Sequence, residues 1–495
     1  MRHAYLRLSE AATALRDSLE TAAAASGLSA AYPPAAVAEA EAAVSAYAPP
    51  GLDLLGIPFV TIDPEGSTDL DQALWIEDEG TGWRVHYAIA DVPGFVPVGT
   101  ELDAETRRRG ETAYLPQGRI PLHPAVISEG AGSLLEGQER GAYVWELLVA
   151  ADGASTLASL RHARVRSREQ LSYPEAQRRL EAGDALMLRL HAFGEARRAD
   201  EARRGGANLG LPEQEIVPAE GGGYRLRSRV PLPIEEDNAQ VSLLTGITAA
   251  AVMLEAGVGL LRTMPAPDPE AERRFRQVTA RLGHPWEQGQ GYGAYLRTLD
   301  VSDPRQLAIM HAAGGLFRGA GYTAFDGAAP AQPQQAAVAA PYAHVTAPLR
   351  RLVDRFGLVL CHAHVNAAPI PAWVREALPT LPEAMKAAGS AVNSAERRSL
   401  DIVEAFLLQG REGERFEAVV TEGRLPSPAP SAAQAPQGAP AAGPRSTGSV
   451  KVTLLDPPVE ARAEGVAESG SLVTLELVSA DIASATIRLR VVDPA

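Results

Sequence analysis

Cysteine, lysine and long apolar runs are scarce in this chain of 495 residues. Cys361 is the single cysteine, which excludes intrachain disulfides and cysteine-based zinc sites. No run of about 18 uncharged apolar residues is evident, and the N-terminus MRHAYLRLSE lacks the apolar core of a signal peptide. We therefore expect a cytoplasmic protein that makes no membrane contact, and we expect it to be a monomer.

Lysine occurs only at Lys386 and Lys451, and the net charge of −15 argues against a general nucleic-acid binder. Nearly every positive charge is therefore an arginine, and the arginines gather in clusters. The clusters are 107–109, 161–168, 197–204 and 350–351. The planar guanidinium suits phosphate, but a compositional bias toward arginine would give the same clusters.

The length predicts two or three domains, because one hydrophobic core does not extend over so many residues. Residues 1–50 read as two alanine-rich helices, at about 9–26 and 34–47, bounded by Gly27 and by Pro33–Pro34. They form a small helical module that is either of the helix-turn-helix kind or a plain packing element. Residues 51–405 mix short β-type runs with longer amphipathic helices, the stretch 165–320 being mostly helical, and predict one large α/β domain.

The C-terminal residues 412–495 have a different pattern, with five short strand-like runs. Five strands at this spacing predict an OB barrel. The proline-, alanine- and serine-rich segment 426–447 separates the first two runs and is expected to be disordered. The expected fold class is therefore multidomain α+β, with a helical module, a mixed α/β catalytic domain and a five-stranded barrel.

The stretch TIDPEGSTDLDQAL, residues 61–74, holds the most informative pattern in the chain. Asp63 follows an apolar strand, and Asp69, Asp71 and Gln72 follow a turn that contains proline and glycine. Carboxylates this close repel one another unless a positive charge lies between them. Three acids on a bent loop therefore predict a site for a hard divalent cation such as Mg²⁺ or Mn²⁺.

Three other interpretations of this stretch compete with metal binding by that loop. An EF-hand that starts at Asp63 needs glycine and glutamate where the chain has Thr68 and Leu74. A phosphatase of the haloacid-dehalogenase type also opens with a strand and an acidic loop, but it needs a downstream lysine followed by an acidic motif, which Lys386 lacks. A solvated acidic turn is disfavoured by the apolar flanks of the row.

The wider sequence resembles the ribonuclease II family, the RNB-domain exoribonucleases. The acidic row is similar to the family signature, and three more segments match in the family's order. They are IADVPGFVPVGTELDAETRRRGETAYLPQGRIPLHP, YAHVTAPLRRLVDR and NSAERRSLD. In that family an OB domain of the ribosomal-protein type follows the catalytic domain, as predicted here for 412–495. Residues 1–50 depart from the family, where two cold-shock domains usually stand.

The resemblance implies a 3′-to-5′ exoribonuclease that hydrolyses single-stranded RNA processively and releases nucleoside 5′-monophosphates. It implies that Asp63, Asp69 and Asp71 hold Mg²⁺, and that Asp71 lies closest to the reaction. Gln72 stands where the family has a fourth aspartate and can offer only a neutral oxygen.

The resemblance also implies roles for residues outside the acidic row. Arg350 would neutralise phosphate charge in the transition state, beside a second RNA-binding arginine, Arg351. Glu396 would orient a ribose hydroxyl or the catalytic arginine. Tyr114 would stack on the terminal base, and Tyr173 is a further candidate near the ribose. The rival interpretation is an RNB-type protein that has lost catalysis and binds RNA.

Overall fold

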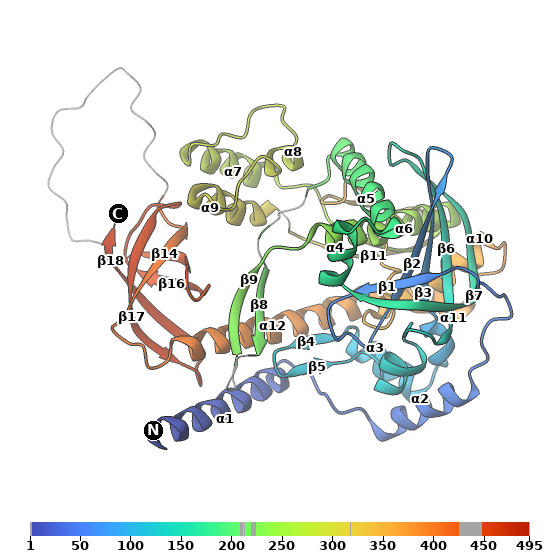
Figure 1. Cartoon of the computed structure of the whole chain (residues 1–495), viewed down its shortest axis with the longest axis horizontal. Coiled ribbons are helices and arrows are strands. Elements are labelled where there is room, and N and C mark those ends of the chain that lie inside the picture. Colours follow the sequence, from blue (N-terminus) through green and yellow to red (C-terminus); the bar gives the residue numbers. More distant parts are fainter. Residues whose placement is uncertain are drawn as a thin grey trace.

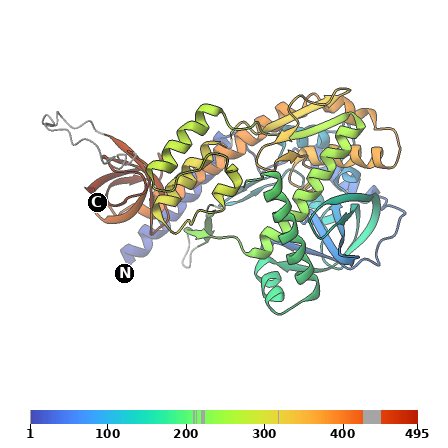
Figure 2. The same ribbon diagram turned by 90° about the horizontal axis from the view of Figure 1, so that it is seen from above.

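The computed structural model describes residues 2–207, 211, 213–218, 224–316, 318–424 and 448–494. It consists of a large mixed α/β body and a smaller C-terminal barrel, joined by one long helix, α12 (Leu381–Leu408). Figures 1 and 2 show α12 leaving the body and ending beside the barrel. The predicted fold class is confirmed. The segment 426–447, predicted as disordered, lies outside the described residues.

The body is built on a closed barrel of five strands in the order β1-β2-β3-β6-β7. The strands are β1 (Phe59–Asp63), β2 (Gln72–Glu79), β3 (Gly82–Ala90), β6 (Glu139–Val149) and β7 (Ser155–Ser172). Alternating side chains such as Ile62, Leu74 and Val85 fill the main core. β1 pairs with β2 antiparallel and with β7 parallel, which closes the barrel. The strand runs read from the sequence are confirmed, but their closure into a barrel was not predicted.

Helices cover the barrel and extend it into the body. They are α3 (Glu101–Arg109), α4 (Tyr173–Glu181), α5 (Ala185–Arg204), α6 (Pro233–Ala256), α7 (Pro269–Arg281), α8 (Tyr292–Leu296), α9 (Pro304–Ala313), α10 (Leu352–Val365) and α11 (Ala372–Ala377). Short helical turns occur at η1 (Val92–Phe95), η2 (Val126–Ala131) and η3 (Gly314–Leu316). The predicted helical stretch 165–320 is mostly helical, but its first eight residues belong to β7.

Among the described residues, four two-stranded sheets complete the body. They are β4 (Ala113–Leu115) with β5 (Gly118–Ile120), β8 (Glu213–Pro218) with β9 (Tyr224–Arg229), β10 (Val258–Thr263) with β11 (Gly321–Asp326), and β12 (Gln334–Gln335) with β13 (Ala340–Pro341). The β4–β5 hairpin matters for the site described below. Its inner face packs through Ala113 and Leu115 on Val392 and Ala395 of α12.

Among the described helices, α6 alone is long and apolar enough by composition to cross a membrane. Half of its most apolar window is buried inside the structure, where Val241 and Leu244 belong to the main core. In this fold the apolar surface of α6 is therefore used for packing.

The two N-terminal helices, predicted as one module, pack on different partners. α1 (Arg2–Ala25) lies along α12, and Figure 1 shows the two side by side. α2 (Pro34–Ala46) packs on α3 and η2 of the body instead. Residues 1–50 thus contribute to two separate surfaces.

The C-terminal barrel closes in the order β14-β15-β16-β18-β17. Its strands are β14 (Arg415–Glu422), β15 (Ser449–Leu454), β16 (Glu460–Glu464), β17 (Leu472–Asp481) and β18 (Thr486–Pro494). β16 and β18 pair in parallel, and the other neighbours are antiparallel, which is an OB-type closed sheet. All five predicted strands are confirmed. Leu15 of α1 and Ile402 of α12 share the barrel's apolar cluster, so the barrel is packed onto the body.

Candidate active site

The acidic row lies on the connection between β1 and β2. Asp63 is the last residue of β1, and Gln72 is the first residue of β2. The turn between them needs glycine at Gly66, whose φ of 80° is in the left-handed region. Leu70 is fully buried, and its N–H donates to Ser133 Oγ at 2.9 Å. The row is therefore anchored to the fold, and the alternative of a solvated acidic turn is wrong.

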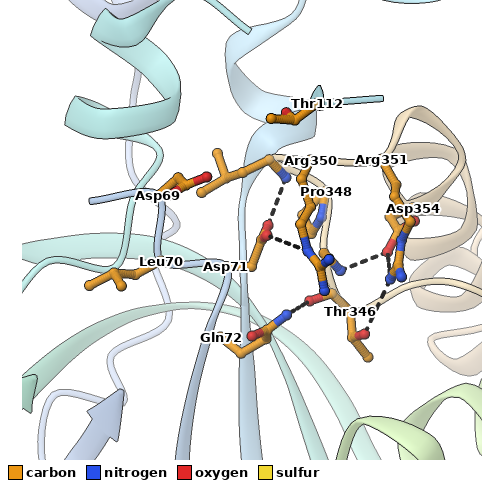
Figure 3. A network of polar contacts seen from close by, with 12 residues as sticks. Asp69, Leu70, Asp71, Gln72, Thr112, Thr346, Pro348, Arg350, Arg351 and Asp354 are labelled. Atoms are coloured by element: carbon orange, nitrogen blue, oxygen red, sulfur yellow. Dashed lines mark hydrogen bonds and ion pairs between the residues drawn. The ribbon is translucent and has the colours of Figure 1, made fainter. Parts of the chain in front are cut away.

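Asp71 is the most enclosed acid of the row, with 3% of its surface exposed. Its Oδ1 accepts the Leu349 N–H at 2.7 Å, and its Oδ2 lies 3.8 Å from Nε of Arg350 (Figure 3). Burial raises the pKa of the Asp71 carboxyl, although Arg350 and the Leu349 N–H oppose that shift. The fold thus brings together two residues that lie about 280 positions apart and that the sequence predicted as catalytic.

Arg350 stands on the loop between β13 and α10, and 48% of its side chain is exposed. A 3.8 Å contact to a carboxylate leaves most guanidinium donors available for another anion. Arg351, predicted to bind RNA, is placed differently. Its Nε and Nη2 donate to Asp354 at 3.0 and 2.8 Å, and Nη2 also contacts Thr346 Oγ1 at 3.4 Å. Because its donors are used on Asp354 of α10 and on Thr346, Arg351 fastens the loop that presents Arg350 to the helix.

Asp63 is a second acid of the row whose charged form is disfavoured by burial. Its Oδ2 is buried and has no hydrogen-bond partner. Burial first, and then the Asp69 carboxylate, raise the pKa of Asp63 to about 7, while Arg350 acts in the opposite direction. A divalent cation would stabilise such a carboxylate, so the oxygen donors of Asp63 and Asp69 fit a hard metal ion.

Asp69 is held by the β4–β5 hairpin. The Tyr114 hydroxyl donates to Oδ2 at 2.9 Å, and Arg119 Nη1 donates to Oδ1 at 2.5 Å. In the described part of the chain, no three His, Cys, Asp or Glu residues lie close enough together to hold an ion as they stand. Asp69 and Asp71 each direct an oxygen at an arginine, Arg119 and Arg350 respectively.

The Gln72 side chain makes its hydrogen bond through the amide nitrogen and not through the oxygen that would ligate a metal ion. Its Nε2 donates to the Thr346 carbonyl at 2.5 Å (Figure 3). A carbonyl can only accept, so the NH₂ group must face Thr346. The side chain thus fastens the start of β2 to the loop that carries Arg350, and its role as a metal ligand stays a prediction.

The two remaining predicted residues lie at the margin of the site. Tyr173 opens α4 directly after Ser172, which pairs with Asp63 across β7 and β1. Burial and the Asp63 carboxylate raise the pKa of Tyr173 to about 12. Glu396 is exposed on α12 and lies near Glu111. Burial first, and then the Glu396 carboxylate, raise the pKa of Glu111. Their predicted ribose contacts stay predictions.

Sequence reasoning missed Arg119 and Glu111. Both lie within the longest family-like segment, but nothing in local spacing distinguished Arg119 from the other arginines. Arginines of two of the clusters that were singled out form ion pairs within the protein. Arg107 pairs with Asp103, Arg108 and Arg109 pair with Glu105, and Arg197, Arg203 and Arg204 pair with Asp200. These contacts show internal partners for the clusters at 107–109 and 197–204, and phosphate binding by them stays a prediction.

A mixed α/β body that carries an acidic row, followed by an OB barrel, is the arrangement of an RNB domain with a C-terminal S1 domain. The family model described as RNB domain matches residues 52–367, and the one described as RNase II-type exonuclease C-terminal S1 domain matches 414–492. The chain belongs to the RNB-domain family, as its sequence predicted.

Two curated relatives illustrate the similarity. The chain is 30% identical over 323 residues to ribonuclease R of Escherichia coli (strain K12), a match that covers 61% of this chain and 39% of the relative. It is 28% identical over 305 residues to exoribonuclease 2 of Aeromonas hydrophila subsp. hydrophila, with coverage of 56% and 45%. The matched segments thus span less than half of either relative.

Solved structures show the same fold at low identity. The apo form of Mycoplasma genitalium RNase R gives a TM-score of 0.80 at 17% identity and covers 96% of this chain and 77% of that one. Yeast Ssd1, described as a pseudonuclease, gives a TM-score of 0.64 at 17% identity, with coverage of 84% and 50%. At these identities the likeness shows the fold alone.

Proposed function

We propose that this protein is a 3′-to-5′ exoribonuclease that hydrolyses single-stranded RNA processively to nucleoside 5′-monophosphates. The observation that carries the proposal is the meeting of the acidic row with Arg350, since Asp71 Oδ2 lies 3.8 Å from the arginine. Family membership supports the reaction class, and the named relatives are ribonuclease R and exoribonuclease 2. We propose a monomer that acts in the cytoplasm.

The acids in this proposal hold Mg²⁺, with Mn²⁺ as an alternative. When bound, paired divalent ions supply an activated water and relieve charge on the leaving oxygen. Asp63 offers an unpartnered buried oxygen, and Asp69 lies close enough to raise the Asp63 pKa. Asp71 is kept in place by the Leu349 N–H, so its carboxylate does not need to be ordered when substrate arrives.

Arg350 acts on the scissile phosphate in this scheme. Its guanidinium is half exposed and keeps donors free, while Arg351 and Gln72 hold the loop beneath it. A positive group fixed at this position stabilises the negative charge that develops on phosphate oxygens in the transition state. No reorganisation of the loop is then needed at the moment of reaction.

Tyr114 positions the RNA end by stacking. Its residue surface is 48% exposed, although its hydroxyl is held by Asp69. An exposed ring fixed at its far end presents a flat apolar face beside the acids, and any base can stack on such a face. Tyr173, beside Asp63, would contact the neighbouring ribose. The C-terminal barrel would bind the RNA upstream of the site.

The test is hydrolysis of a single-stranded RNA labelled at either end, in MgCl₂ or MnCl₂. We expect a 3′ label to leave at once as a nucleoside 5′-monophosphate, and a 5′ label to remain on one short end product without a ladder of intermediates. Endonucleolytic fragments, or release of a 5′ label first, would contradict the proposal. Asp71→Asn is the matched inactive control.

A catalytically impaired RNA-binding protein is the second candidate. Gln72 favours it, because this side chain brings no charge to the row and donates to a backbone carbonyl. RNA that binds but stays intact at every Mg²⁺ and Mn²⁺ concentration, together with hydrolysis by Gln72→Asp, would establish this alternative.

A further inference from the structure

Arg119 occupies a position beside Asp69 that a metal ion would also seek. Its Nη1 lies 2.5 Å from Asp69 Oδ1, on the carboxylate that neighbours Asp63. Since Tyr114 takes Oδ2 at 2.9 Å, both oxygens of Asp69 are engaged. A cation that ligates Asp69 must therefore replace at least one of these donors.

The guanidinium of Arg119 has a second carboxylate within reach. Its Nη2 lies 2.7 Å from Glu129 Oε1 and 2.6 Å from Thr68 Oγ1. Glu129 belongs to η2, a separate element from the acidic row. Arg119 thus bridges Asp69 and Glu129, and it can leave Asp69 without losing every charged partner.

The rest of the hairpin is fixed. Ala113 and Leu115 pack in one apolar cluster with Val392 and Ala395 of α12, and with Ala23 of α1. The Gln117 side chain also donates to the Leu19 carbonyl of α1 at 3.1 Å. Because the hairpin is held on its inner face, an exchange at Asp69 needs only a rotation of the long Arg119 side chain.

We propose that Arg119 is a positioning residue that competes with the catalytic metal for Asp69 and keeps only its Glu129 and Thr68 partners when the ion binds. The inference rests on the proposed function, since it requires Asp69 to be a metal ligand. In the metal-free protein the Arg119 charge offsets part of the negative charge that Asp69 and Asp63 bring together. Once the ion takes over that charge, Arg119 remains as a cation beside the site, held by Glu129 and Thr68.

The experiment is calorimetric titration of the RNA-free full chain with MgCl₂ and, separately, MnCl₂. Arg119→Gln removes the competing charge but keeps a side chain able to bond Thr68. We expect it to bind either ion about tenfold more tightly than the unsubstituted protein, since a charge-assisted hydrogen bond is lost from the metal-free state. Glu129→Gln should have the opposite effect, because Arg119 loses its alternative partner and stays on Asp69.

Arg189→Ala is the matched control, because it removes one positive charge from an exposed pair with Asp78 far along the chain. We expect its metal affinity to equal that of the unsubstituted protein. Weaker metal binding by Arg119→Gln would mean that Arg119 orients Asp69 for the ion, and unchanged binding would mean that Arg119 is purely structural. If the unsubstituted protein binds metal and hydrolyses RNA, either result overturns the inference about Arg119 and leaves the proposed function standing. If neither Mg²⁺ nor Mn²⁺ binds to the unsubstituted protein or to Arg119→Gln, the proposed metal site is overturned as well.

Discussion

Asp63 provides the sharpest test of the site, because its strain can be measured without any substrate. Its carboxyl is buried with one unpartnered oxygen, and its pKa rises from 3.8 to about 7. An acid whose pKa is higher in the folded state favours folding when it is protonated. Stability is therefore lost as the pH rises from about 4 through about 7. Asp63→Asn removes the charge and keeps the shape.

The size of the effect follows from the two pKa values. A difference of roughly three pH units corresponds to about 4 kcal/mol at pH 8 in the absence of metal. The amide NH₂ of asparagine also needs a partner, so we expect a net gain of about 2–4 kcal/mol in unfolding free energy. At pH 5 most of the penalty has disappeared from the wild type, and the gain should fall by more than half.

The assay is denaturant unfolding with a chelator present, at pH 8 and pH 5, for the wild type and Asp63→Asn. Adding Mg²⁺ at pH 8 should stabilise the wild type and reverse the order, because ligand binding to the folded state raises its stability. Asp78→Asn, at an exposed carboxylate, is the control. A loss of stability in Asp63→Asn at pH 8, or a gain that does not depend on pH, would refute this account of the site.

Three further changes test the remaining roles. Asp71→Asn keeps the side-chain shape and its contact with the Leu349 N–H, so turnover should fall by several orders of magnitude while RNA affinity, measured by fluorescence anisotropy, survives; near-normal degradation would remove Asp71 from the mechanism. Tyr114→Ala should change the length of the final RNA fragment through the loss of about 1–3 kcal/mol of stacking per base. Tyr114→Phe should keep that length, so a shared change in both variants would point to the bond with Asp69. Gln72→Asp should lower the Mg²⁺ concentration for half-maximal rate, yet cost about 1 kcal/mol of metal-free stability because the bond to the Thr346 carbonyl is lost; an unchanged Mg²⁺ requirement would show that Gln72 acts only through the loop.

The acidic row, the family, the first three strands of the catalytic barrel and the five strands of the C-terminal barrel could be predicted from the amino-acid sequence. Each of these depends on residues that are close in the chain. Asp63, Asp69 and Asp71 are placed by one strand and one turn, and the five C-terminal strands follow from short alternating runs between turn residues. Periodicity and turn chemistry are local, so a linear sequence displays them.

Only the tertiary structure determined which side chains and backbone groups contact the acids of the row and Gln72. The Arg119 contact with Asp69 spans 50 positions, the Gln72 contact with Thr346 spans 274, and the Leu349 contact with Asp71 spans 278. No spacing rule connects residues so far apart. Arginine is common in this chain, and only the packing of the β4–β5 hairpin and the loop before α10 determines which guanidinium reaches an acid of the row. Local patterns therefore determined which carboxylates lie together in the row, whereas long-range packing decided which arginines and backbone amides contact them.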